Sequence, residues 1–170
     1  LLESLSLSVQ DRLMSDVPVG IVLSGGLDSS LMAALAHDAA DSAGKPVPEC
    51  WTVADSEDNV DFHASSMVAQ NQDLGHHVHL MNENTMWREL PKFVWNGEDL
   101  DITVMFWQSV FEQMRGKVTV ALCGQGADEL HAGYSRYRDL PSHSAQIQNR
   151  LQLNDSISIS SDDRGLGKSW

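Results

Sequence analysis

The stretch Ser24-Gly25-Gly26-Leu27-Asp28-Ser29-Ser30, called the first glycine loop below, decides the fold class of this chain. It follows a short continuous apolar run, Val19–Leu23, which is typical of a strand buried on both faces of a sheet. From Leu27 to Ala40, apolar side chains recur at helical spacing. A strand, a glycine turn and a helix in this order indicate the first half of a β-α-β unit with parallel strands.

The same alternation continues along the chain. Further strands are predicted over residues 49–53, 76–81 and 118–122, and further helices over 2–14, 60–74, 84–95 and 103–115 and from 127 onward. The sequence therefore predicts an α/β protein, a three-layer sandwich around a parallel sheet of about four to five strands.

The helix predicted over 60–74 shows how the pattern assigns a buried face. We expect Gly75 to end this helix, because glycine is a frequent C-terminal stop. The apolar side chains at helical spacing are expected to face inward; they are Val60, Ala64, Met67, Val68 and Leu74.

Composition and charge narrow the class of function. Hydrophobic residues make up 42% and charged residues 21% of the chain, an ordinary globular balance. The formal net charge of −13 at pH 7 argues against a nucleic acid or an anionic membrane as the main partner, because like charges repel. The two cysteines, Cys50 and Cys123, are too few for a disulfide framework, and no apolar run approaches the roughly 18 residues of a membrane helix. We therefore expect a reducing, cytoplasmic setting.

The first glycine loop has the features of an anion-binding site. In a parallel sheet the carboxyl ends of the strands share one edge, and ligands bind there near a switch in strand order. A second glycine loop, Gly124-Gln125-Gly126, follows the predicted strand 118–122 and should lie at the same edge. Backbone N–H groups at a helix start bind anions, and glycine lets them approach a ligand closely. Asp28 would repel a bare phosphate, so its presence suggests a bridging Mg²⁺.

A simpler interpretation of the first glycine loop stays open at this point. The loop could be an ordinary turn in which Asp28 and Ser29 cap the helix that follows. Its glycine spacing matches neither the Walker pattern nor the dinucleotide-binding fingerprint.

The first glycine loop resembles the pyrophosphate loop of the N-type ATP pyrophosphatases, the PP-loop superfamily, whose fold is called adenine nucleotide alpha hydrolase-like. Within that group the chain resembles the synthetase domain of the glutamine-hydrolysing asparagine synthetases. The matching segments lie within roughly residues 9–139. They are Arg12–Gly20 leading into the first loop, His76-His77, and Gly124–Leu130 followed by Gly133-Tyr134 and Arg136-Tyr137.

The resemblance implies an ATP-dependent, amide-forming ligase. A carboxylate, by default that of aspartate, attacks the α-phosphate of Mg²⁺-bound ATP, pyrophosphate leaves, and ammonia then displaces AMP to form the amide, by default asparagine. The implied cofactors are ATP and Mg²⁺, and the implied partners are these small molecules and a separate glutaminase domain or chain. Residues 1–140 would form a partial ATP-binding domain of this family. We expect residues 141–170, with their serine-rich and aspartate-rich end, to be a flexible tail.

Three residues match catalytic positions of the family. Asp28 and Asp128, one beside each glycine loop, match carboxylates that bind Mg²⁺. Gln125 stands where the family usually has the glutamate of a Gly-Glu-Gly loop, which is important for forming the acyl-adenylate. Glutamine keeps the size of glutamate but loses its charge and its ability to accept a proton.

Other residues match positions that contact the nucleotide. Leu23 and Val53 match positions around the adenine, with Val53 acting through its backbone, and Cys123 and Gly124 match a nucleotide-contacting pair. The residues implied to hold the leaving pyrophosphate, besides Asp28, are Ser24, Gly25, Gly26, Ser29 and Ser30.

Departures from the family pattern keep two alternatives open. The chain starts inside a predicted helix, as if cut from something longer, and it carries no N-terminal cysteine nucleophile and no glutaminase domain. The family's later helical part, with its catalytic lysine, has no match in 140–170, and Glu98-Asp99-Leu100 replaces an Asp-Glu-Pro stretch. One alternative is a nucleotide-binding protein that does not adenylate. The other is a different PP-loop enzyme, such as one that modifies tRNA, which the acidic charge disfavours.

Two polar segments have no role assigned by these motifs. The acidic run Asp55–Asp61 follows the second predicted strand, so it either approaches the ligand edge or is a solvated loop. On the next strand His77 and His79 should share one face while His76 points to the other, an arrangement that is weak evidence for a metal site.

Overall fold

The computed structural model describes residues 1–14, 16–97, 105–131, 133–134, 138–139, 141–142, 144–145 and 148. The chain divides into two compact units, Leu1–Gln125 and Gly126–Trp170, and each is described by itself. The first unit holds the sheet, and helix α6 (Ala127–His131) belongs to the second. Residues 98–100 and most of the expected tail at 141–170 lie outside the described residues.

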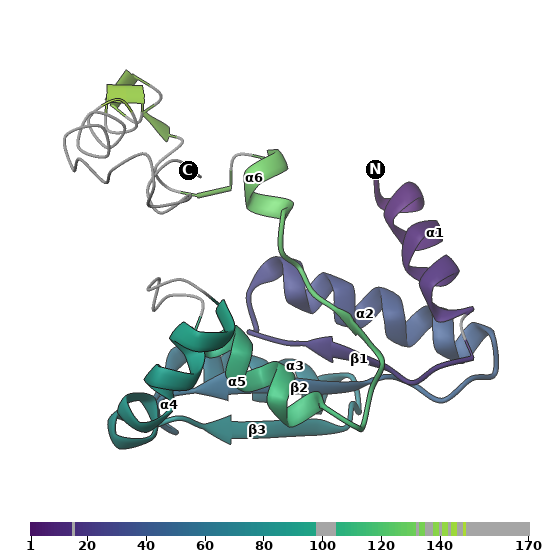
Figure 1. Ribbon diagram of the computed structural model, residues 1–170. Coiled ribbons are helices and arrows are strands. Elements are labelled where there is room, and N and C mark those ends of the chain that lie inside the picture. Colours follow the sequence, from purple (N-terminus) through teal and green to yellow (C-terminus); the bar gives the residue numbers. More distant parts are fainter. Residues whose placement is uncertain are drawn as a thin grey trace, which may run out of the picture. The chain divides into compact units, whose positions relative to one another are not determined.

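Four parallel strands form the sheet of the first unit (Figure 1). In the strand order β3-β2-β1-β4, Ile21 of β1 stands opposite Cys50 of β2 and Leu122 of β4. The chain adds β2 and β3 on one side of β1 and then β4 on the other, so the switch in strand order lies between β1 and β4. The strands are β1 (Val19–Val22), β2 (Glu49–Ala54), β3 (His76–Leu80) and β4 (Val120–Leu122).

Helices cover both faces of this sheet, which confirms the predicted three-layer α/β architecture (Figure 1). On one face, small alanines of α2 pack against Ile21 and Leu23 together with side chains from α1 and α3. On the other face α4 and α5 cover Trp51 and Met81. No helix in the described ranges is long and apolar enough to cross a membrane. The helices are α1 (Leu2–Leu13), α2 (Leu27–Ser42), α3 (Val60–Asn71), α4 (Glu83–Gly97) and α5 (Met105–Met114).

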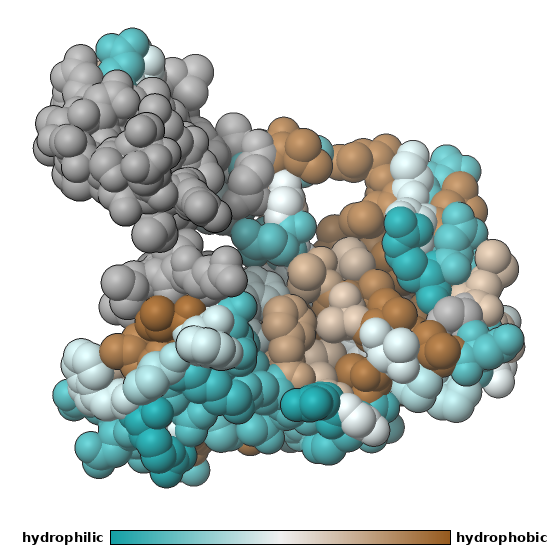
Figure 2. Space-filling view, viewed as in Figure 1, coloured by the Kyte–Doolittle hydropathy of each residue, from teal (hydrophilic) through white to brown (hydrophobic). Residues whose placement is uncertain are grey.

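Helix α1 contributes one face to the core. Val9 and Leu13 are buried against α2, whereas Leu2, Leu7 and Met14 remain exposed. The space-filling view shows apolar residues gathered towards α1 and β1, while hydrophilic residues dominate over α4 (Figure 2).

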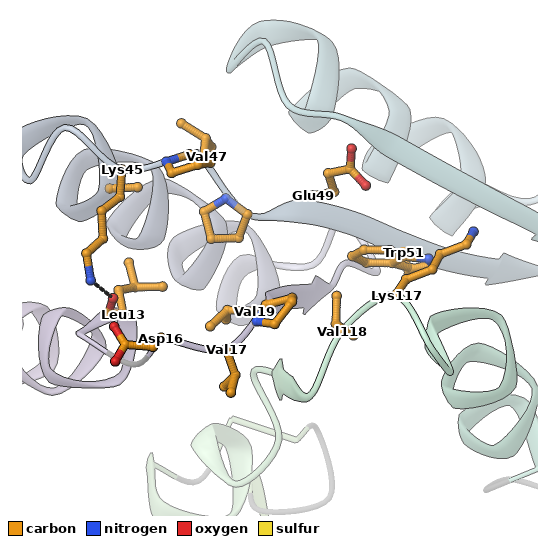
Figure 3. Close-up of a pocket in the computed structure, with 14 residues that line it drawn as sticks. Leu13, Asp16, Val17, Val19, Lys45, Val47, Glu49, Trp51, Lys117 and Val118 are labelled. Carbon is orange, nitrogen blue, oxygen red and sulfur yellow. Dashed lines mark hydrogen bonds between the residues drawn. The ribbon is translucent and has the colours of Figure 1, made fainter.

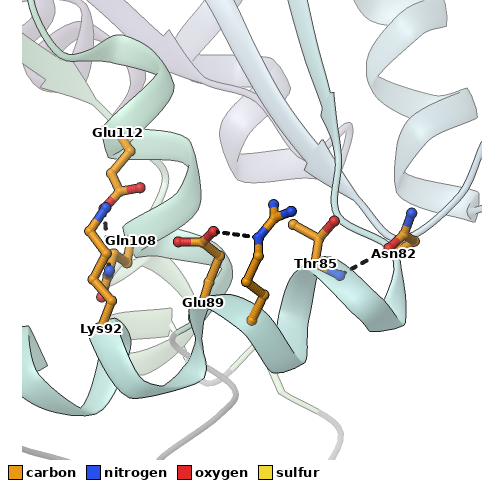
Figure 4. A network of polar contacts seen from close by, with 7 residues as sticks. Asn82, Thr85, Glu89, Lys92, Gln108 and Glu112 are labelled. Carbon is orange, nitrogen blue, oxygen red and sulfur yellow. Dashed lines mark hydrogen bonds and ion pairs between the residues drawn. The ribbon is translucent and has the colours of Figure 1, made fainter.

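Helix α4 is connected to α5 by a polar contact near the surface (Figure 4). Lys92 Nζ lies 2.6 Å from Glu112 Oε1, and Gln108 donates to the same oxygen at 3.3 Å. The hydrogen bond from Lys92 is the main cause that lowers the pKa of Glu112. Lys92 and Glu112 are both partly exposed, so water screens this pair and its contribution to stability is small.

The prediction of which α3 residues face inward is partly wrong. Val60 is 79% and Met67 is 62% exposed, and the buried residues of this helix are Ser65 and Ala69. The side chains that this helix buries are thus small, and one of them, Ser65, adjoins the close approach of α3 to Gly25. The helix also ends earlier than predicted, at Asn71, and Asp73 rather than Gly75 takes the left-handed conformation, with φ 51°.

Gly20 in β1 leaves the space that Trp51 of β2 occupies. A Cβ on Gly20 would lie 2.5 Å from Cζ3 of Trp51 and 3.0 Å from Cε of Met114. Trp51 is 2% exposed, so its ring cannot move aside without disturbing the core between the sheet and α5.

We expect Gly20→Ala to lower the free energy of unfolding by about 1–3 kcal/mol, because it overpacks this core. Gly97→Ala is the matched control, since a Cβ on Gly97 would meet only Phe93, at 3.9 Å. Urea denaturation of both variants measures the difference. Equal midpoints for the two variants would show that the tryptophan does not require a glycine beneath it.

Candidate functional site

The two glycine loops meet beside the switch in strand order. A Cβ on Gly124, just after β4, would lie 2.8 Å from Cβ of Asp28 and 2.9 Å from the backbone nitrogen of Ser29. Real side chains do not tolerate such distances, so this contact requires glycine. The start of the second loop therefore rests against the first turn of α2, and both loops lie at the carboxyl edge, as predicted.

The first glycine loop is also in contact with α3. Gly25 has φ +81°, a conformation that favours glycine, and a Cβ on it would lie 2.5 Å from Cβ of Ala64 and would also collide with the backbone nitrogen of Ser65. The loop is thus held between backbone on two sides.

Hydrogen bonds inside the first loop fix its shape. The buried hydroxyl of Ser29 accepts from the Ser24 amide at 3.2 Å and donates to the Gly26 carbonyl at 3.2 Å. The exposed Ser24 hydroxyl lies 3.0 Å from that of Ser29 and accepts from the Gly26 amide at 3.3 Å. Ser30 Oγ is buried and has no hydrogen-bond partner among the described residues. Ser29 therefore braces the loop, whereas Ser24 faces outward.

Helix α2 begins without a side-chain cap. Its N-cap is Gly26, which has no side chain to accept from the amides of the first turn. The interpretation of Asp28 and Ser29 as caps is therefore not what the structure shows. Uncapped amides at the start of a helix carry a partial positive charge and need acceptors. An anion at the carboxyl edge of β1 would supply them.

The sequence on either side of the first glycine loop holds few basic side chains. Between Arg12 and Arg88 the only lysine or arginine is Lys45, and its ammonium donates to the Leu13 carbonyl at 2.7 Å, at the end of α1. Asp28 stands in the first turn of α2 with no lysine or arginine nearby in sequence. The described residues hold no cluster of three or more metal-binding side chains. One carboxylate nevertheless fits Mg²⁺, which proteins commonly bind through one or two carboxylates and the phosphates of a substrate.

The remaining predicted site residues occupy different environments. Leu23 is 1% exposed and its side chain packs in the core, so a contact with adenine would have to come from its backbone. The Val53 side chain packs towards α4 and α5, so Val53 too could contact adenine only through its backbone. Cys123 is half-buried and Gln125 is exposed. Asp128 lies on α6 in the second unit, so its pairing with Asp28 around one ion stays a prediction.

A polar chain that sequence analysis missed supports the end of β1. Thr52 donates its hydroxyl to the Leu23 carbonyl at 2.6 Å, so His76 Nε2, 2.8 Å from Thr52 Oγ1, must be the donor in that contact. Burial, with a smaller contribution from His77, lowers the pKa of His76, which favours its neutral form. As predicted, His77 points to the other face, where it stacks on Trp51 at 4.7 Å. A threonine within an apolar strand was the available signal.

A hollow of about 580 Å³ lies at the opposite edge of the sheet (Figure 3). Its walls are mainly prolines and valines around Trp51, and its acidic and basic residues are Asp16, Glu49, Lys45 and Lys117. None of the predicted site residues lines it. It borders the amino ends of β1 and β2, whereas ligands of parallel sheets bind at the carboxyl ends, so the glycine loops remain the candidate site.

Comparison with known proteins agrees with this fold. The NH3-dependent NAD synthetase from Campylobacter jejuni has a similar structure, with a TM-score of 0.55 and 17% sequence identity, over 79% of this chain and 59% of that one. At this identity the likeness concerns the fold alone.

Sequence comparison identifies the family. The chain is 33% identical to the bovine glutamine-hydrolysing asparagine synthetase over 79% of this chain and 25% of that protein. It is 32% identical to asparagine synthetase 1 of Bacillus subtilis over 78% of this chain and 21% of that protein. The chain thus spans about a quarter of the length of these relatives. The family model described as asparagine synthase matches residues 1–167, and this chain therefore belongs to the asparagine synthase family.

Proposed function

We propose that this chain is the nucleotide-binding part of an ATP-dependent ligase that converts a carboxylate, by default aspartate, into its amide. A carboxylate oxygen forms a bond to the α-phosphorus of ATP while the bond to the β-phosphate oxygen breaks, and pyrophosphate leaves. Ammonia then attacks the acyl carbon of the adenylate, loses a proton and displaces AMP. The relatives' names include glutamine hydrolysis, so we propose a glutaminase domain or chain as the ammonia source. We propose a cytoplasmic location for this small-molecule chemistry.

One observation carries this proposal. The uncapped first turn of α2 lies beside the switch in strand order, and the backbone at Gly124 from the neighbouring strand rests against it. This arrangement presents backbone donors from α2 at the place where parallel sheets bind ligands. A polyphosphate has acceptors of the matching kind and charge.

The residues of the first loop have separate roles in this proposal. The Gly25 amide donates to the leaving pyrophosphate, and the Gly26 amide and the Ser24 hydroxyl donate to it in exchange for their present bonds to Ser24 Oγ and Ser29 Oγ. Ser29 keeps the loop in shape. Asp28 would hold Mg²⁺, which when bound neutralises phosphate charge and orients the α-phosphate. Asp128, on the helix α6 that follows the second glycine loop in sequence, is the proposed second ligand.

Gln125 decides between adenylation and binding alone. It is exposed and follows Gly124 directly, so it can reach a nucleotide held by the first loop. Its amide can donate and accept hydrogen bonds, but it cannot take up a proton as a carboxylate can. In the proposed reaction Gln125 orients the substrates, and the step proceeds more slowly than it would with glutamate.

We expect Gly124→Ala to weaken the binding of Mg·ATP by at least about tenfold, because the new methyl group would push the second loop away from α2. Competition against a fluorescent ATP analogue, followed by anisotropy, measures the affinity. Gly97→Ala is again the control, because its added methyl group has space. A folded Gly124→Ala variant with unchanged affinity would contradict the proposed site.

Turnover tests the chemical half of the proposal. With ammonium and Mg·ATP, the chain should release pyrophosphate only when aspartate is present, and Gln125→Glu should raise the rate by at least about tenfold, in line with the usual contribution of an acid–base group. Gln10→Glu is the control, because it adds the same charge at an exposed position of α1. If both the unmodified chain and Gln125→Glu bind Mg·ATP and neither releases pyrophosphate, this chain by itself binds nucleotide without adenylating.

A further inference from the structure

Helix α3 is in direct contact with the first glycine loop. At Gly25 the loop backbone lies so close to Ala64 and Ser65 that no side chain would fit between them. Ser65 is fully buried, and its hydroxyl donates to the Phe62 carbonyl one turn earlier at 3.1 Å. The position of α3 therefore limits where the Gly25 amide can lie, because neither backbone can yield without moving the other.

A single residue fixes the start of α3. Asn59 is the N-cap, and its side-chain oxygen accepts from the amides of Asp61 at 2.7 Å and Phe62 at 3.4 Å. The backbone amide of Asn59 donates to the Ser56 carbonyl at 3.3 Å. An asparagine before a helical run is a frequent cap, which was the available sequence signal.

The other end of the same side chain reaches back to the sheet. Asn59 Nδ2 donates to Asp55 Oδ1 at 2.7 Å, and Asp55 follows the last residue of β2 directly. This pair, called the Asp55–Asn59 clasp below, joins the end of β2 to the start of α3. It uses the donor and the acceptor of one amide at once, which neither alanine nor ionised aspartate can do. Asp55, Glu57 and Asp58 of the acidic run are all exposed, and Asp55 has a defined partner in Asn59.

We propose that Asn59 is a positioning residue for the first glycine loop. The Asp55–Asn59 clasp sets the start of α3, α3 places Ala64 and Ser65, and these set the direction of the Gly25 amide. The effect on ligand binding rests on the proposed function, because there the Gly25 amide donates to the pyrophosphate of ATP. The effect on the loop itself does not depend on any ligand.

Asn82 offers a matched control within the same protein. It caps α4 just after β3, where its side chain accepts from the Thr85 amide at 3.0 Å (Figure 4). Asn59→Ala and Asn82→Ala each remove one cap, so both should lower the melting temperature, Asn59→Ala by more because it also loses the bond to Asp55. Only Asn59→Ala should shift the Gly25 amide resonance and speed its hydrogen exchange, and only Asn59→Ala should weaken Mg·ATP binding, by about tenfold.

Exchanging the charged and the neutral side chain of the Asp55–Asn59 clasp distinguishes the effect of the clasp from the effect of the helix cap. Asn59→Asp keeps an acceptor for the helix amides but places a second carboxylate against Asp55, so the Gly25 resonance should shift although the cap remains. The double variant Asp55→Asn/Asn59→Asp restores one donor and one acceptor and should return the resonance towards its original position.

The measurements on Gly25 use the protein without nucleotide, so they decide the inference even if the chain does not bind ATP. An unchanged Gly25 amide in both Asn59→Ala and Asn59→Asp would overturn it, as would equal Gly25 shifts in Asn59→Ala and Asn82→Ala. A shifted Gly25 amide in a chain that shows no Mg·ATP binding would support the inference and contradict the proposed function alone.

Discussion

The close backbone approaches on either side of the first glycine loop determine the geometry of the candidate site. Gly25 rests against α3, and Gly124 rests against the first turn of α2. Both contacts bring backbone to a distance that excludes every side chain. They hold the carboxyl end of β1 between the loop of the neighbouring strand and the helix that follows β2. The amides that would face a ligand therefore acquire fixed directions from tertiary packing, because a glycine-rich segment alone is conformationally free.

Electrostatics explains why the expected ligand is a metal complex. The uncapped start of α2 attracts an anion, but Asp28 stands in that same turn, and the net charge of the chain is −13. Lys45, the only basic residue between Arg12 and Arg88, is engaged at the end of α1. A bare triphosphate would meet the carboxylate of Asp28 there. A cation that arrives with the phosphates removes this repulsion, and Asp28 then becomes a favourable ligand.

Much of the fold could be predicted from the sequence because its signals are local. Apolar runs and helical spacing gave the strands and helices of the first unit, and the glycine pattern placed both loops at one edge. Contacts between distant residues could not be predicted. The space for Trp51 above Gly20, the burial of Ser65 and Ala69 in place of Val60 and Met67, and the internal bonds of Ser29 all depend on how closely neighbouring layers pack.

In the candidate site too, the residue types could be predicted from the sequence and the contacts between distant segments could not. The residue types of the first loop and the resemblance to a family gave the list of site residues, and the structure places the first glycine loop beside Gly124. Pairing of Asp28 with Asp128 remains a prediction, because Asp128 belongs to the second unit. The link from Asp55 through Asn59 to Gly25 involves three segments, so neither motif nor spacing could reveal it.

The binding of Mg·ATP, measured by titration calorimetry, tests the central claim most directly. The unmodified chain and Asp38→Ala, which alters an exposed carboxylate farther along α2, should bind with equal affinity. Asp28→Ala should bind at least about tenfold more weakly, and the difference should disappear when Mg²⁺ is removed. Equal affinity of Asp28→Ala and the unmodified chain, or no binding by either, would contradict the assignment of the first glycine loop as the nucleotide site.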